Sequence, residues 1–145
     1  MWRELVTFVW LLALSVSDIR EKKVPVWLLW VGFMTGAGIL LYRAAAGETD
    51  PMQAVSALLP GAALLLLAAG TKKAGCADGI VLMAIGALEG DRGCLAVCFG
   101  SLVLIALLSG VLLALKRVRR NTKLPFIPFL TAGWLILICG KSGIL

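Results

Sequence analysis

Long apolar runs separated by short polar clusters are the feature that most limits what this chain can fold into. The runs are about 15 to 23 residues long, close to the roughly 20 residues that an α-helix needs to cross a bilayer. The composition agrees, because 61% of the 145 residues are hydrophobic, against roughly 45–50% in an average globular protein. A soluble core could not bury so much apolar surface. The sequence therefore predicts one all-α domain over residues 1–145, a polytopic membrane protein with about six transmembrane helices.

Six apolar segments are expected to form these helices. Proline suits the first turn of a helix, so Pro25 and Pro51 mark the starts of the second and third helices. Gly32 and Gly36 have the small-xxx-small spacing that lets another helix approach closely. The fourth segment is the shortest. The expected bounds are about 5–16, 25–43, 51–69, 78–88, 94–115 and 124–139.

Basic residues divide unequally between the two ends of the expected helices. The segments after the first, third and fifth helices hold ten of the fourteen: Arg20, Lys22, Lys23, Lys72, Lys73, Lys116, Arg117, Arg119, Arg120 and Lys123. The opposite ends carry the other four, together with most of the acids. Because cytoplasmic loops are enriched in Lys and Arg, both termini are expected outside and the three basic loops in the cytoplasm. This rule accounts for the net charge of +6 without nucleic acid, for which the chain has no aromatic-basic surface.

The residue types also limit the chemistry. The chain has no histidine, which removes Ser-His and Cys-His catalysis. Cys94 and Cys98 lie one helical turn apart in an apolar run, with no further metal-ligating residues nearby. We therefore predict no metal site, and expect both thiols to pack as small hydrophobic groups.

Two aspartates, Asp18 and Asp78, fall at the expected cytoplasmic ends of the first and fourth helices. Two carboxylates held close together cannot both ionise cheaply, so they share a proton. One can then deprotonate a water while the other polarises a peptide carbonyl, as in aspartic proteases, with no cofactor. Each acid also has a simpler explanation. Asp78 could cap the fourth helix, and Asp18 could be a solvated charge at the membrane interface.

Three segments resemble the type IV prepilin peptidase family. Residues 17–25 (Ser-Asp-Ile-Arg-Glu-Lys-Lys-Val-Pro) are similar to its first aspartate motif, and residues 75–78 (Gly-Cys-Ala-Asp) to its second, Gly-x-Gly-Asp. Residues 124–130 (Leu-Pro-Phe-Ile-Pro-Phe-Leu), followed by Gly133, resemble its closing Pro-Phe-x-Pro-Phe segment. The three occur in the family's order, and the resemblance covers nearly all of the chain.

The resemblance implies a membrane aspartic endopeptidase of the bacterial cytoplasmic (inner) membrane. Its substrates would be type IV prepilins or pseudopilins, whose leader peptide it removes at the cytoplasmic face in pilus assembly or protein secretion. Asp18 and Asp78 would be the catalytic pair. The substrate's apolar helix and the lipid bilayer would be its partners, while homo-oligomerisation is left open. The residues expected to shape the site, the prolines by breaking the last helix, are Gly75, Ala77, Gly79, Pro125, Phe126, Pro128 and Phe129.

Three differences from the family pattern bear on this reading. Ala77 stands where the pattern has its second glycine, and would strain the chain if the backbone there needs a positive φ. Ile80 stands where many members have lysine, unless Lys72 or Lys73 supplies that charge. The N-terminal insert with paired Cys-x-x-Cys motifs is missing, so we expect peptidase activity without methyltransferase activity.

Two other interpretations stay open. Ala77 and Ile80 are compatible with a catalytically inactive relative, or with a non-enzymatic membrane protein that assists pilus assembly. A small ion-coupled transporter would use Asp18 and Asp78 as proton or cation ligands, since intramembrane ionisable groups often mark ion pathways. Both acids are expected near the interface and not at mid-membrane, which disfavours transport.

Overall fold

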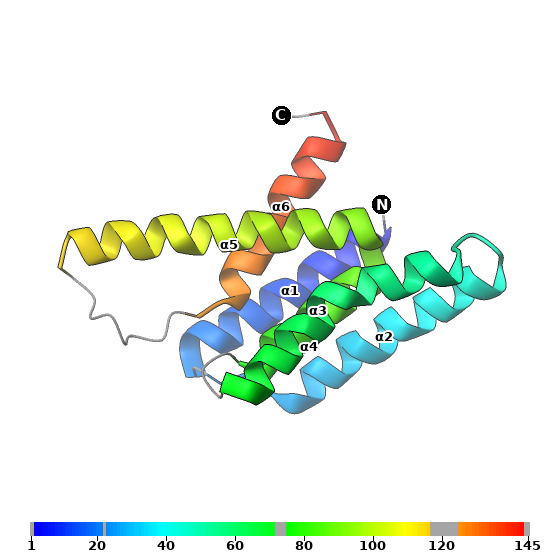
Figure 1. Cartoon of the computed structure of the whole chain (residues 1–145), viewed down its shortest axis with the longest axis horizontal. Coiled ribbons are helices and arrows are strands. Elements are labelled where there is room, and N and C mark those ends of the chain that lie inside the picture. Colours follow the sequence, from blue (N-terminus) through cyan, green and yellow to red (C-terminus); the bar gives the residue numbers. More distant parts are fainter. Residues whose placement is uncertain (1, 22, 72–74, 117–124, 144–145) are drawn as a thin grey trace.

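The computed structural model describes residues 2–21, 23–71, 75–116 and 125–143, and within these ranges every regular element is an α-helix. The all-α prediction and the number of helices are confirmed. Figure 1 shows α5 crossing the bundle and extending beyond it, while α6 rises on the far side. The helices are α1 (Trp2–Glu21), α2 (Val26–Ala45), α3 (Pro51–Thr71), α4 (Cys76–Glu89), α5 (Asp91–Ala114) and α6 (Ile127–Lys141).

Three of the helices are long and apolar enough to cross a membrane. They are α2, α3 and α5, and α6 is a shorter apolar helix. The 14 residues of α4 rise only about 21 Å, less than the roughly 30 Å hydrocarbon core. The structure therefore supports a multi-pass membrane protein, whereas six complete crossings remain a prediction.

The short helix α4 forms the centre of the bundle. Its side chains from Val81 to Leu88 are buried, except for the half-buried Met83. It packs against α2, α3 and α5, with smaller contacts to α1 and α6. A helix that is surrounded by protein does not need to match the thickness of the bilayer, because its environment is not lipid.

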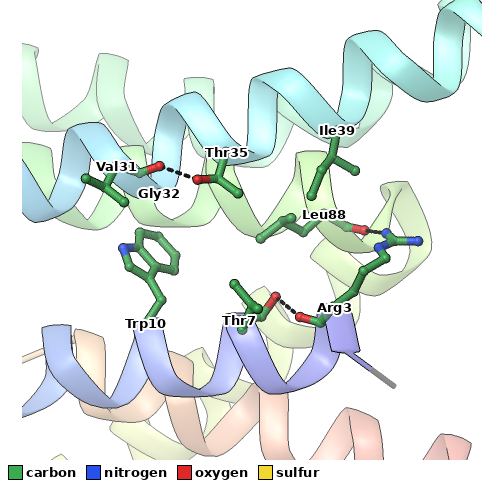
Figure 2. A pocket seen from close by; sticks show the side chains of 9 residues that line it. Arg3, Thr7, Trp10, Val31, Gly32, Thr35, Ile39 and Leu88 are labelled. Atoms are coloured by element: carbon green, nitrogen blue, oxygen red, sulfur yellow. Dashed lines mark hydrogen bonds between the residues drawn. The ribbon is translucent and has the colours of Figure 1, made fainter.

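Glycines bring α2 close to its neighbours, as their spacing predicts. A Cβ at Gly32 would overlap the indole ring of Trp10, which reaches across from α1 (Figure 2). A Cβ at Gly36 would lie 3.2 Å from the carbonyl oxygen of Ala84 in α4. The predicted close helix approach at these two positions is confirmed.

Exposed aromatic side chains mark the two ends of α2. Trp27 and Trp30 are 68% and 55% exposed near its start, and Tyr42 is 73% exposed near its end. Tryptophan and tyrosine gather at the two membrane–water interfaces, where an apolar ring with a polar edge is best accommodated. The spacing of these residues is consistent with α2 standing across a bilayer.

Contacts between distant segments show which helix ends lie together. At one end the Arg3 guanidinium donates a hydrogen bond to the carbonyl of Leu88 (Figure 2), and Lys141 forms an ion pair with Glu89 at 2.8 Å. The starts of α4 and α6 and the end of α1 meet at the opposite end, where both aspartates lie. This grouping of the helix ends agrees with the side of the membrane to which the loop charges assign each end. Which end of the bundle faces the cytoplasm stays a prediction. Several of the basic residues used for it lie outside the described residues, namely Lys22, Lys72, Lys73 and those in 117–124.

Candidate active site

Asp78 occupies the third position of α4, after the helix cap at Gly75. Its backbone N–H donates to the Gly75 carbonyl at 3.1 Å, and its carboxylate accepts the Gly75 backbone N–H. This reciprocal pairing satisfies groups that a helix start otherwise leaves open. The capping role considered from the sequence is therefore present, although Asp78 acts from inside the helix. A Cβ at Gly75 would lie 3.0 Å from Asp78 Oδ2, so the close approach favours glycine.

Asp18 lies in the last turn of α1 and meets the start of α6. Its carboxylate accepts a hydrogen bond from the backbone N–H of Ile127, the first residue of α6. The positive end of a helix dipole favours a carboxylate at this position. Asp18 Oδ2 is buried and has no hydrogen-bond partner among the residues that the structure describes. That oxygen is the part of the carboxylate left for a proton or a water.

The fold brings the two aspartates close enough to affect each other's ionisation. Burial, and after it the negative charge of Asp18, raise the pKa of Asp78 from 3.8 to about 6, against the opposing effect of the Gly75 N–H. Burial also raises the pKa of Asp18, opposed by the Ile127 N–H. Both carboxylates lie outside the three membrane-length helices. The site therefore holds two coupled acids that favour sharing a proton.

The residues beside Asp78 have structural roles that sequence alone left undecided. Ala77 is the second residue of α4 and packs against the core; the one positive φ among described non-glycine residues is at Lys116. Alanine is therefore accommodated without backbone strain. Gly79 is buried where α4 crosses α3, and its Cβ would lie 3.0 Å from the Cβ and backbone N of Leu65. Gly79 serves close helix packing, since its own φ is negative.

The two prolines of the closing segment stand at the start of α6, not in the middle of a helix. Pro125 and Phe126 precede the helix, and Pro128 is its second residue, where a missing N–H costs no hydrogen bond. The Phe126 carbonyl accepts the N–H groups of Phe129 at 3.0 Å and Leu130 at 3.1 Å. The expected helix break is thus a helix beginning. The segment acts on the site through its backbone.

Backbone donors are the part of the site that the sequence analysis missed. The N–H groups of Gly75 and Ile127 each bind one of the two carboxylates. Pro128 could have indicated that a helix begins there, because proline suits a first turn. The local sequence did not indicate that the start of this helix would lie beside Asp18. Ile80 packs half-buried against the core, and a compensating charge from Lys72 or Lys73 lies outside the described residues. Among described residues, no group of three or more His, Cys, Asp or Glu could hold a metal ion.

An all-helical chain with membrane-length apolar helices and two coupled carboxylates has the components of a membrane aspartic peptidase. Residues 5–115 match the type IV leader peptidase family, and the chain belongs to that family. The matched region contains both aspartates and ends before the Pro-Phe-x-Pro-Phe segment. No curated protein and no solved structure matches the chain. Membership of the family implies a peptidase.

Proposed function

We propose that this protein is a membrane aspartic endopeptidase that removes the leader peptide of type IV prepilins or pseudopilins at the cytoplasmic face. Family membership supports a leader-peptidase function. The observation that carries the catalytic assignment is the electrostatic coupling of Asp18 and Asp78, which lie on different helices and far apart in the sequence.

The paired carboxylates divide the work of hydrolysis between them. Ionisation of Asp78 is disfavoured by burial and by the neighbouring negative charge, so up to a pH of about 6 Asp78 holds the shared proton. Asp18, ionised and held by the Ile127 N–H, deprotonates the attacking water. Protonated Asp78 then polarises the scissile carbonyl and stabilises the oxyanion that forms. When the C–N bond breaks, Asp18 passes the proton taken from water to the leaving amine, which restores the starting protonation of the pair. This route needs neither a metal nor a covalent intermediate.

The location of the pair suits a substrate with a polar leader followed by an apolar helix. Asp78 is in the first turn of α4 and Asp18 in the last turn of α1, so both lie at one end of the bundle. The basic residues Arg20 and Lys23 are exposed close by in the sequence, as expected at the cytoplasmic face. The substrate's apolar helix would remain in the bilayer while the bond before it reaches the two carboxylates.

Co-expression with tagged candidate prepilins from the same genome tests the proposal. Leader removal is scored by gel shift, and the new N-terminus is determined by sequencing. We expect cleavage by the wild type and none above background by Asp18→Asn or Asp78→Asn. Asp50→Asn, which changes an exposed acid before α3 at the other end, is the matched control and should cleave normally.

Two results would count against the proposal. Cleavage that survives either Asp18→Asn or Asp78→Asn would overturn the assignment of the pair. Absence of cleavage of every candidate by wild-type protein, with a known leader peptidase active in the same assay, would favour a catalytically inactive relative.

A further inference from the structure

A polar pocket lies at the end of the bundle opposite the aspartate pair. Its volume is about 260 Å³, and the ends of α2, α4 and α6 and the starts of α3 and α5 contribute to it. Glu89, at the end of α4, lies about 16 Å along the helix axis from Asp78 at its start. We call this site the basic pocket; its charged side chains are Arg43, Glu89, Arg92 and Lys141.

Positive charge exceeds negative charge in the lining of the basic pocket. Three cationic side chains and one carboxylate line it, and because Arg92 already interacts within the protein, Arg43 is the cation considered for a ligand. Glu89 is already engaged at both oxygens: Oε2 accepts Lys141 Nζ at 2.8 Å, and Oε1 accepts Trp134 Nε1 at 3.4 Å. Glu48 is 63% exposed and 4.0 Å from the Arg43 Nε, so this pair contributes little. The protein itself leaves the positive charge of Arg43 largely uncompensated.

Neutral hydrogen-bond donors converge on the same pocket. Thr49 lines it, and the Oγ1 of this residue is buried with no hydrogen-bond partner among the described residues. A buried hydroxyl without a partner is unfavourable until a ligand supplies one. The first turn of α5 also lines the pocket at Gly90 and Gly93, and this helix start has no side-chain cap. Its first backbone N–H groups form the positive end of a long helix.

We propose that the basic pocket binds a phosphate oxyanion, which in the membrane is the headgroup phosphate of a phospholipid. The Arg43 guanidinium, a hydroxyl and a helix start together match the several oxygens and the charge of a phosphate group. Leu40 and Ala57 complete the lining with apolar surface, which suits the glycerol and the first methylenes of a lipid. Arg43 follows the exposed Tyr42 at the end of α2, so the basic pocket lies at the level of the membrane–water interface that Tyr42 marks.

The test uses full-length protein purified in phosphate-free detergent and does not depend on peptidase activity. Native mass spectrometry measures retention of phosphatidylglycerol, with diacylglycerol of the same acyl chains as the phosphate-free match and inorganic phosphate as a competitor. We expect one lipid retained by the wild type and at least about tenfold weaker binding by Arg43→Gln. Lys116→Gln removes one exposed charge from the other end of α5 and should bind like wild type.

Thr49→Val provides a second variant that keeps the charge and nearly the shape of the side chain. It should weaken lipid binding severalfold, while the unfolding temperature without lipid stays the same or rises because an unpaired buried hydroxyl is removed. Competition by millimolar inorganic phosphate would identify free phosphate as the ligand, and retention despite phosphate would identify the lipid headgroup. Equal retention of diacylglycerol and phosphatidylglycerol, or equal lipid binding by wild type and Arg43→Gln, would overturn the proposal.

Discussion

Replacing Asp78 with asparagine should stabilise the protein at neutral and alkaline pH while abolishing catalysis. The folded protein raises the pKa of Asp78 from 3.8 to about 6, because burial and the charge of Asp18 disfavour its ionised form. The unfolded chain relieves both effects. An asparagine oxygen can still accept the Gly75 N–H, so the helix start keeps its hydrogen bond.

The effect of Asp78 on the free energy of unfolding depends on pH, because its pKa differs between the folded and the unfolded state. Below about pH 3.8 the carboxyl is protonated in both states, and the wild type carries no penalty. As the pH rises from there, the unfolded state loses its proton first, and the free energy of unfolding falls until the pH exceeds about 6. The difference between the pKa values of 3.8 and about 6 corresponds to about 3 kcal/mol. Partial exposure and coupling to Asp18 reduce this, so we expect Asp78→Asn to gain about 1–3 kcal/mol at pH 8.

The assay is reversible unfolding of detergent-solubilised protein in SDS, followed by circular dichroism from pH 4 to pH 8. The difference between Asp78→Asn and wild type should be near zero at pH 4 and reach its full value above pH 6. Asp50→Asn, an exposed acid, should follow the wild type throughout. Parallel stability curves for Asp78→Asn and wild type, or a less stable variant at pH 8, would refute the argument that burial and Asp18 raise this pKa.

Three further predictions address catalysis, packing and topology. The kcat/KM for leader cleavage should fall as the pH rises through about 6, where Asp78 loses the shared proton; a flat profile from pH 5 to 8 would contradict the paired mechanism. Gly79→Ala should cost about 1–3 kcal/mol because its Cβ would lie 3.0 Å from α3, whereas Gly38→Ala, with nothing within 4 Å, should be neutral or stabilising in the same SDS titration. A membrane-impermeant maleimide should label exposed Cys76 in inverted vesicles but not in intact cells, and buried Cys94 in neither; labelling of Cys76 in intact cells would reverse the proposed orientation.

Much of the helical architecture could be predicted from local sequence. Proline at residue 51 marks the start of α3, and the glycine pair in α2 correctly indicated close helix contacts. Helix α1 extends to Glu21, beyond the expected apolar segment, because charged residues at the end of a helix remain hydrated while the backbone continues. Helix α4 begins at Cys76, so Asp78 lies within the helix. Apolar pattern alone could not show this, since a helix start depends on its cap.

The site was only partly readable from the same information. Asp18 and Asp78 could be singled out because both fall at the expected cytoplasmic ends of apolar helices, and the resemblance linked them. The roles of Gly79 and Pro128 could not be derived in this way. Close packing against α3 and a helix start directed at Asp18 both depend on which helices become neighbours.

The sequence by itself determined that the chain is helical, membrane-embedded and supplied with two candidate acids, because hydropathy, charge and composition act locally along the chain. Only the tertiary structure decided that the two acids lie close enough to affect each other's ionisation and that Asp18 receives a hydrogen bond from the start of α6. It also decided that the other end of the bundle collects a basic pocket from five helices. Coupled pKa values and converging donors depend on distances between groups that are remote in sequence. Helix packing sets those distances, and no local pattern encodes them.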